Sequence, residues 1–255
     1  MTNATNAIPR PSLALLSSEP WRAAIEFASF KFGKPKATPA GDGHPVVIFP
    51  GLATDAKAVL PLLRHCEALG YQAMDWGRGF NRGPQGDIDA WTRELADDIA
   101  RMISPFRRKV TLIGWSLGGI YAREVAKRIT PRVRQVITIG TPINVSADNT
   151  NVGWLMRLLN RDAAHLDHAS LQRFSKAPAV PTTSIYSRLD GIVAWQACLH
   201  KKQSATVEDV EVNGSHIGMG WNPEVLSVVG DRLAQRPRGW RRYRADGSAS
   251  IDVKQ

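Results

Sequence analysis

The sequence has 255 residues, of which 43% are hydrophobic and 22% charged, with 21 glycines and 16 prolines. This balance excludes a disordered, collagen-like or low-complexity chain, and the length fits a single α/β domain. The formal net charge is +10, from 33 Lys and Arg against 23 Asp and Glu. Because the basic residues of the body are scattered and form no recognised binding motif, we expect a solvated surface and no nucleic-acid partner.

The two cysteines, Cys66 and Cys198, are too few for a disulfide framework, and neither belongs to a cluster with zinc-ligand spacing. No apolar run approaches the roughly 18 residues of a membrane span. The apolar run over residues 13–16 is too short for a secretory signal. These features predict a cytoplasmic protein that is not stably inserted in a membrane.

Strand and helix patterns alternate along the chain. Apolar and β-branched runs predict strands over residues 45–49, 71–76, 109–113, 133–139, 182–186 and 207–212. Apolar residues at helical spacing predict helices over residues 56–69, 88–102, 118–129 and 194–202. Strands that alternate with helices predict an α/β fold, with a mostly parallel, twisted sheet and helices on both of its faces.

Two segments depart from this alternation. Residues 143–180 contain amphipathic turns around Trp154 and Leu158, and we expect a small helical cap or lid insertion there. Residues 236–255 contain six basic and two acidic residues. This composition predicts a basic, disordered tail, with Trp240 and Tyr243 leaving a docking segment as the alternative. Neither segment marks a second domain, so residues 1–255 are assigned to one domain.

The sharpest chemical signal is GWSLG at residues 114–118, which fits G-x-S-x-G. Such a string arises by chance in roughly one chain in ten of this composition, so its weight comes from its position between a strand and a helix. At that turn the serine backbone is strained, and glycines leave the room it needs. Ser116 is therefore expected at the carboxyl edge of the sheet, where open α/β sheets bind ligands.

A serine hydroxyl needs a base within hydrogen-bond reach and a third group that orients the base. Among the six histidines, His216 follows the last predicted strand, whereas His44 enters a strand at the opposite end and His200 falls in a predicted helix. Asp190 leaves the end of the preceding strand, between nucleophile and base in the chain. We therefore predict the catalytic triad Ser116, Asp190 and His216.

Acyl transfer also needs two donors aimed at the developing oxyanion. The backbone N–H of Leu117, at the start of the predicted helix, is the first candidate. The second should come from the loop after the strand over residues 45–49, where we expect the Leu52 N–H, with Gly51 allowing close approach. The alternative for this loop is a simple turn.

With these motifs the chain resembles an α/β-hydrolase of the lipase/esterase group. The elbow at residues 114–118, the acid turn SRLDG at 187–191 and the histidine turn GSH at 214–216 carry the resemblance. The segment IGTP at residues 139–142 is similar to one in triacylglycerol-lipase-like and GPI-inositol-deacylase-like members. The resemblance covers about residues 46–233. It implies the α/β-hydrolase fold and cleavage of carboxylic esters through a serine acyl-enzyme, without a metal or organic cofactor.

The sequence departs from the family pattern at two places. Ile143 and Asn144 follow the Gly-Thr-Pro segment where His and Gly are common, and Pro50 precedes Gly51 where many lipases have His. The first departure weakens the transfer of a lipase specificity. The second leaves the backbone donor in place but changes its surroundings.

The substrate is expected to be a small-molecule or lipid ester. The residues proposed to line its pocket are Gly51, Trp115, Trp154, Leu155 and Leu158. The same apolar stripe is equally the way a cap helix packs onto its domain. An acyltransferase or thioesterase would use the same triad, cofactor-free haloperoxidases resemble the chain too, and a non-catalytic binding protein of this fold is the alternative from another class. Acyl-chain length and oligomeric state stay open.

Overall fold

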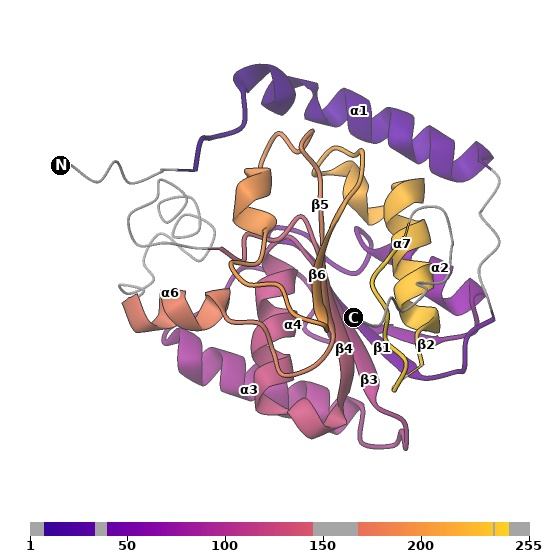
Figure 1. Cartoon of the computed structure of the whole chain (residues 1–255), viewed down its shortest axis with the longest axis vertical. Helices are drawn as coiled ribbons and strands as arrows, with labels where there is room; N and C mark the ends of the chain where they lie inside the picture. The colour runs from indigo at the N-terminus through magenta and orange to yellow at the C-terminus, as the bar shows by residue number, and fades with distance from the viewer. Residues whose placement is uncertain (1–7, 34–39, 145–167, 237, 245–255) are drawn as a thin grey trace, which may run out of the picture.

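The computed structural model of the protein describes residues 8–33, 40–144, 168–236 and 238–244. These residues form one open sheet with helices on both faces (Figure 1). The strands are β1 (Pro45–Phe49), β2 (Gln72–Asp75), β3 (Val110–Trp115), β4 (Val133–Ile139), β5 (Thr182–Tyr186) and β6 (Val207–Glu211). The α-helices are α1 (Leu13–Phe32), α2 (Leu60–Ala68), α3 (Ile88–Met102), α4 (Leu117–Arg128), α6 (His168–Ser175) and α7 (Pro223–Ala234). Three 3-10 turns are η1 (Thr130–Arg132), η2 (Trp195–Cys198) and η3 (Gly218–Gly220).

The six strands are all parallel and lie in the order β2-β1-β3-β4-β5-β6. In the centre of the sheet Gly114 of β3 pairs with both Phe49 of β1 and Thr138 of β4, so these three strands end at one level. The segments that follow them therefore meet at the same edge. The predicted α/β fold, with a parallel sheet and helices on both faces, is confirmed.

Apolar side chains alternate between the two faces of the sheet. On β1, Val47 and Phe49 pack with α3 and α4, whereas Val46 and Ile48 pack with α2 and α7. Successive side chains of a strand point to opposite faces of the sheet. Because both faces are buried here, the sequences of the strands are continuous apolar runs. The sheet is therefore packed on both faces by apolar side chains, and its carboxyl edge is the support for the loops that follow the strands.

Helix α1 was not predicted, and its burial explains why. Its buried residues are Glu19 and Ala23, whereas Leu13, Trp21 and Phe32 are 81%, 73% and 86% exposed. A helix pattern is recognised from apolar residues on the inward face, and α1 has the reverse arrangement. It lies across the carboxyl end of the sheet, at the top of Figure 1.

The prediction of a helix over residues 194–202 was wrong. Only the 3-10 turn Trp195–Cys198 forms there, and Leu199 is already extended, with φ −85° and ψ 142°. Ser184 donates its hydroxyl to the Cys198 carbonyl at 2.7 Å, and Asp209 accepts from the His200 amide at 3.2 Å. These tertiary hydrogen bonds hold the segment against β5 and β6 in a conformation that is not helical. The helical spacing of its apolar residues could not indicate them. Helix α7 was not predicted, and α2 begins four residues later than expected.

The expected cap and tail fall partly outside the described residues. Of the cap, α6 packs beside α4 through the buried Phe174, while residues 145–167 are not described. Of the tail, residues 238–244 lie against α7 and β6: Tyr243 donates its amide to Glu208 at 2.8 Å, and Arg232 donates to the Arg241 carbonyl at 2.6 Å. This part of the tail is therefore ordered by packing.

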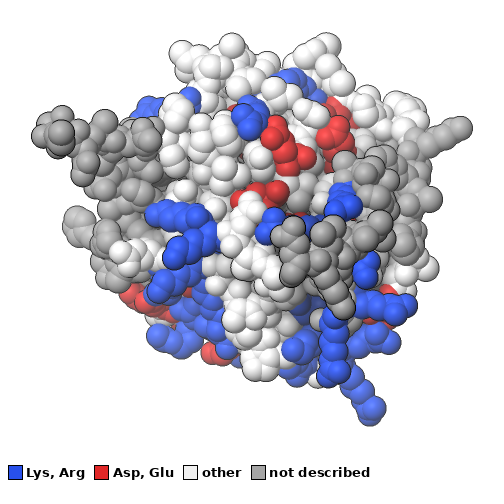
Figure 2. All heavy atoms as spheres, viewed as in Figure 1, with Lys and Arg blue, Asp and Glu red and all other residues white. Residues whose placement is uncertain are grey.

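The positive charge is not centred on the end of the molecule that α1 covers. Figure 2 shows that Lys and Arg gather on the lower half of the visible face, away from α1.

Among the described residues, no helix is long and apolar enough to cross a membrane.

Candidate active site

The turn between β3 and α4 places Ser116 in a strained backbone conformation, with φ 53° and ψ −124°. Glycines surround it because other residues do not fit. A Cβ on Gly114 would lie 2.3 Å from the Gly118 carbonyl oxygen, and one on Gly118 would lie 2.3 Å from that of Phe49. The Ser116 amide donates to the Ile139 carbonyl at 2.8 Å, which ties the turn to the end of β4. Strain held by such packing is typical of functional sites.

The structure brings together Ser116, His216 and Asp190, from three separate loops. The Ser116 Oγ lies 3.1 Å from His216 Nε2, and His216 Nδ1 lies 2.7 Å from Asp190 Oδ2. All three residues are at most 6% exposed. The result is a continuous hydrogen-bonded chain from hydroxyl to imidazole to carboxylate.

Asp190 is held by the turn that follows β5. Its Oδ1 accepts hydrogen bonds from the backbone amides of Ile192, at 2.8 Å, and Val193, at 2.6 Å. Because Oδ1 is occupied in this way, Oδ2 is left to face the imidazole. The carboxylate is therefore oriented before any ligand binds.

His216 follows β6 and is buried among acceptors. Burial lowers the pKa of His216, but the charge of Asp190, its hydrogen bond and the charge of Glu19 together raise it above the ordinary value of 6.5. Trp115 donates its indole N–H to the His216 carbonyl at 3.1 Å, and the two rings lie 6.1 Å apart. The environment therefore favours the imidazolium form relative to a solvated histidine.

The loop after β1 lies directly against the nucleophile. A Cβ on Gly51 would be 3.4 Å from the Ser116 Cβ, so the two turns are in contact. Within the described part of the chain, neither the Leu52 amide nor the Leu117 amide donates a hydrogen bond. Ala53 has φ 56° and is, with Ser116, one of two non-glycine residues of the described chain with positive φ. The two expected oxyanion donors are thus both unoccupied and beside Ser116.

Asn81 braces this loop, and the sequence analysis missed it. Its side chain is fully buried and donates to the Pro50 carbonyl at 2.9 Å. Its backbone accepts from the Ala53 amide at 2.8 Å and donates to the Thr54 carbonyl at 2.7 Å. A single residue therefore holds the turn on both sides of Leu52. Asn81 lies in the Gly-rich segment over residues 77–86, and no local pattern in the sequence marks it.

Thr141 has a similar role on the other side of the nucleophile. Its hydroxyl donates to the Ser116 carbonyl at 2.9 Å, and a Cβ on Gly119 would lie 2.0 Å from the Thr141 Oγ1. The IGTP segment at residues 139–142 was singled out by resemblance. Its contact with the elbow is what the structure adds.

The expected pocket residues are only partly placed. Trp154, Leu155 and Leu158 lie outside the described residues. Trp115 is 5% exposed, packs in the core between the sheet and α7, and donates to the His216 carbonyl. It also lies beside Gly51, 3.6 Å from the position of a Cβ there, and its place in the substrate pocket stays a prediction. Gly51 lies beside Ser116, as expected.

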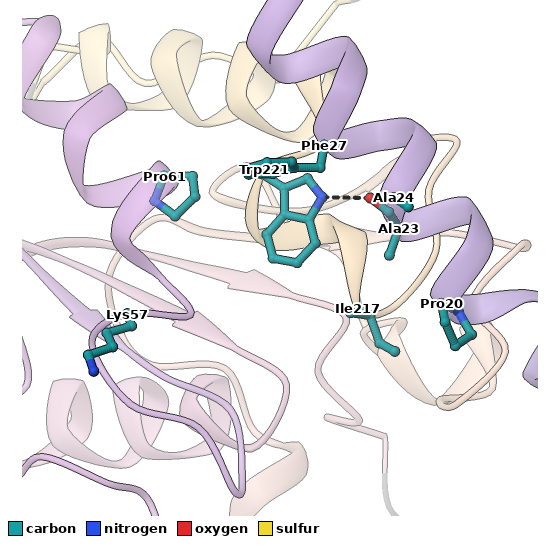
Figure 3. A pocket seen from close by; sticks show the side chains of 8 residues that line it. All are labelled: Pro20, Ala23, Ala24, Phe27, Lys57, Pro61, Ile217 and Trp221. Atoms are coloured by element: carbon teal, nitrogen blue, oxygen red, sulfur yellow. Dashed lines mark hydrogen bonds between the residues drawn. The ribbon is translucent and has the colours of Figure 1, made fainter.

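An apolar pocket of about 450 Å³ lies next to the histidine loop (Figure 3). It is lined by Ile217, the residue after His216, by Trp221, the residue after η3, and by side chains of α1 and the start of α2, including Phe27 and Pro61. In the described part of the chain, no three His, Cys, Asp or Glu side chains form a group suited to hold a metal ion.

Chemically, this arrangement can activate a hydroxyl. The imidazole can accept its proton at Nε2 and the carboxylate can stabilise the resulting charge. The Leu117 amide follows Ser116 directly, and the Leu52 amide follows Gly51, which lies against Ser116. These are the parts required for acyl transfer.

Solved structures with the same fold include lipases. The chain is similar to lipase B of Aspergillus fumigatus, with a TM-score of 0.58, 19% identity and coverage of 79% of this chain and 55% of that one. It is also similar to the lipase BlEst2 of Bacillus licheniformis, with a TM-score of 0.56, 20% identity and coverage of 77% and 94%. At these identities the likeness concerns the fold.

Curated relatives include hydrolases and esterases. The serine hydrolase BPHL of Mus musculus is 26% identical over 119 residues, which are 44% of this chain and 41% of that protein. The pimeloyl-[acyl-carrier protein] methyl ester esterase of Legionella pneumophila (strain Corby) is 28% identical over 99 residues, 39% of this chain and 38% of that protein. The matches therefore span about two-fifths of these relatives.

A family model described as the alpha/beta hydrolase family matches residues 40–248, which include all six strands and the Ser116, Asp190 and His216 loops. This match covers more than half of the sequence and agrees with the observed sheet order and with the lipase folds. The chain belongs to the alpha/beta hydrolase family.

Proposed function

We propose that this protein is a serine esterase that hydrolyses carboxylic esters through an acyl-enzyme. The observation that carries the proposal is the Ser116 Oγ, held 3.1 Å from His216 Nε2 on a strained turn next to two unoccupied amides. The esterases among its relatives support the ester as the substrate class.

In the first half of the proposed reaction, Ser116 Oγ attacks the acyl carbon while His216 Nε2 takes the hydroxyl proton. The carbonyl oxygen becomes an oxyanion and receives hydrogen bonds from the Leu52 and Leu117 amides. When the C–O bond to the alcohol breaks, His216 returns the proton to the leaving oxygen. Asp190 stays ionised throughout and stabilises the imidazolium.

In the second half, water replaces the alcohol. His216 removes a proton from the water, the resulting hydroxide attacks the acyl carbon, and the bond to Ser116 Oγ breaks as the proton is returned to it. The products are a carboxylic acid and the free serine.

We expect the acyl group to be apolar, and we keep Trp154, Leu155 and Leu158 as the proposed lining of its site, together with Gly51. The proposed cap over residues 143–180 would then decide the acyl-chain length. Small-molecule and lipid esters both fit this description.

The test combines a fluorophosphonate probe with p-nitrophenyl esters from acetyl to palmitoyl, using wild type and Ser116→Ala. The proposal requires covalent labelling and ester turnover in wild type and the loss of both in the variant. A chain-length optimum would size the acyl site.

Two other outcomes would change the assignment. Labelling at Ser116 without turnover of any ester would favour an acyltransferase or a thioesterase, since these use the same nucleophile with another acceptor or leaving group. No labelling of folded protein would favour a binding protein of this fold.

A further inference from the structure

The buried carboxylate of Glu19 contacts both loops that carry the charged members of the candidate triad. Its Oε1 accepts from the backbone amides of Gly191, at 2.7 Å, and His216, at 3.0 Å, and its Oε2 accepts from the Ile217 amide at 3.0 Å. Gly191 follows Asp190 directly. One side chain therefore ties the acid loop to the base itself, although it lies 197 residues away from His216 in the chain.

The packing of α1 on these loops is close, independently of Glu19. A Cβ on Gly191 would lie 2.5 Å from the Leu15 carbonyl oxygen, and one on Gly218 would lie 2.1 Å from the Glu26 Oε2. Figure 3 shows Trp221 of the histidine segment against α1, donating its indole N–H to the Ala23 carbonyl at 3.0 Å. Glycine is thus required at position 191 because the backbone of α1 occupies the space of a side chain, whereas at position 218 the Glu26 side chain occupies that space.

The contacts of Glu19 are suited to an ionised carboxylate, which is an acceptor only. Every partner is a donor: three backbone amides and Arg22, whose Nη2 lies 3.0 Å from Oε1. Glu19 is 1% exposed, so loss of an acceptor would leave buried amides without a partner. This places a negative charge beside the backbone of the proposed base.

The charged groups near this loop come from three elements. They are Asp190 after β5, Glu19, Arg22 and Glu26 on α1, and Glu224 on α7, which accepts from the Asn213 amide at 2.9 Å. Of these, Asp190 and Glu19 raise the pKa of His216 against the lowering effect of burial. Glu26 accepts a hydrogen bond from the neighbouring Ser215 amide at 2.7 Å and makes no hydrogen bond with His216.

We propose that Glu19 is a positioning residue for the candidate triad, which holds the Asp190 and His216 loops together and places a negative charge at the backbone of His216. The proposal rests on the proposed function, and it concerns a helix outside residues 40–248, which the family model matches. Helix α1 then supports the candidate active site through Glu19, on its buried face. The exposed apolar side chains of α1 are not involved in this support.

The experiment compares wild type with Glu19→Gln, Glu19→Asp and Glu26→Gln. In Glu19→Gln an NH2 group replaces one acceptor, so at least one backbone amide faces a donor and the charge is lost. We expect kcat for p-nitrophenyl butyrate to fall about tenfold or more with KM little changed, since displacement of a catalytic group lowers kcat. We also expect the acid limb of kcat/KM to move to lower pH.

A second readout does not depend on turnover. The His216 ring is titrated by NMR in each variant, with the resonance assigned by its loss in His216→Gln. Glu19→Gln should lower the His216 pKa. Glu19→Asp keeps the charge but is one methylene shorter, so kcat should fall while the NMR titration stays near that of wild type.

Glu26→Gln is the matched control, because it makes the same change on the same helix and loop without touching His216. It should keep kcat within about threefold and leave the titration in place. If Glu19→Gln lowers only the Tm, with kcat and the His216 titration as in wild type, Glu19 is structural and the proposal is overturned. If Glu19→Gln does not fold, wild-type kcat in folded Glu19→Asp would overturn it equally.

Failure of the proposed function would look different. In that case Ser116→Ala would keep the activity of wild type, whereas the NMR titration would still report whether Glu19 acts on His216.

Discussion

Among the described residues, two Asp–His–hydroxyl chains lie at opposite ends of β3. At the carboxyl end, Asp190, His216 and Ser116 are joined at 2.7 and 3.1 Å. At the amino end, Asp42 lies 2.5 Å from His44 Nδ1, and His44 Nε2 lies 2.9 Å from the Thr111 hydroxyl. By distances alone the two are equivalent.

Their surroundings separate them. Thr111 lies within β3 and is fully buried, whereas Ser116 is on a strained turn followed by the free amide of Leu117. The charge of Asp42 is shared with cations, since Arg134 lies 2.7 Å and Arg108 3.3 Å from its Oδ2. Among the described residues, the hydrogen-bond partners of the Asp190 carboxylate are His216 and two backbone amides.

The two histidines respond in opposite directions. Burial lowers the pKa of His44, and the charges of Arg134 and Arg108 add to that against the effect of Asp42. The pKa of His216 is raised instead. A hydrogen-bonded triad is therefore insufficient as a sign of catalysis, and the backbone strain, the free donors and the sign of the neighbouring charge carry the distinction.

The largest contrast is expected between the two hydroxyls. Ser116→Ala should lower kcat/KM for p-nitrophenyl butyrate by about 10⁴-fold or more, because the nucleophile is lost and only binding and the oxyanion donors remain. Thr111→Val, of similar shape, should stay within about threefold of wild type. Comparable losses in both variants would mean that Ser116 has no chemical role.

The two carboxylates should differ nearly as much. Asp190→Asn should lower kcat by about 10⁴-fold, because the amide NH2 donates a hydrogen bond to His216 Nδ1 and so stabilises the wrong tautomer. Asp42→Asn should leave kcat nearly unchanged and lower the Tm, measured by calorimetry, through loss of its Arg and His partners. Retained activity in Asp190→Asn would contradict the assignment of the acid.

Asn81 tests the oxyanion loop. Asn81→Ala removes the hydrogen bond to Pro50 and loosens the Leu52 amide, so kcat should fall about 10- to 100-fold with little change in KM. The matched control is Tyr121→Phe, which removes only the 3.4 Å hydrogen bond to the Asn81 Oδ1. If both variants keep wild-type kcat, another donor serves the oxyanion.

The smallest expected effect is a difference between two pH midpoints on acidification, that of kcat/KM and that of the free energy of unfolding. His216 must be neutral to act as a base, so kcat/KM should fall as pH drops through its pKa, which lies above 6.5. The pKa values of His44 and His200 are lowered, mainly by burial, so their contribution to stability is present above pH 6.5 and is lost as pH falls through the folded-state values. Against the lowering effect of burial, the pKa of His216 is raised, mainly by Asp190, so its contribution to stability has the opposite pH dependence. That contribution is present at low pH and is lost as pH rises through the folded-state pKa of His216.

Activity should therefore decline at a higher pH than the free energy of unfolding. Rate profiles and urea titrations from pH 5 to pH 8 would measure the two midpoints independently. Coincident midpoints would mean that the activity loss reports unfolding rather than His216.

The parts of the site that the sequence revealed are those with a local pattern. Ser116 was found from the glycines on either side of it, and Asp190 and His216 from their places after predicted strands, where the structure also puts them. Asn81 and Glu19 were missed because their roles depend on backbone atoms 31 and up to 198 residues away. No spacing rule connects such positions.

By itself, the sequence determined the α/β class, the order of the central elements and the three candidate side chains, because strand period and turn chemistry are local properties. The tertiary structure decided what surrounds those side chains. It placed the carboxylate of Glu19 on the buried face of α1. It also gave the hydrogen-bonded chain that ends at Ser116 different surroundings from the one that ends at Thr111. Burial, charge and amide partners arise only when distant loops meet, so they distinguish the two ends of β3 where residue types do not.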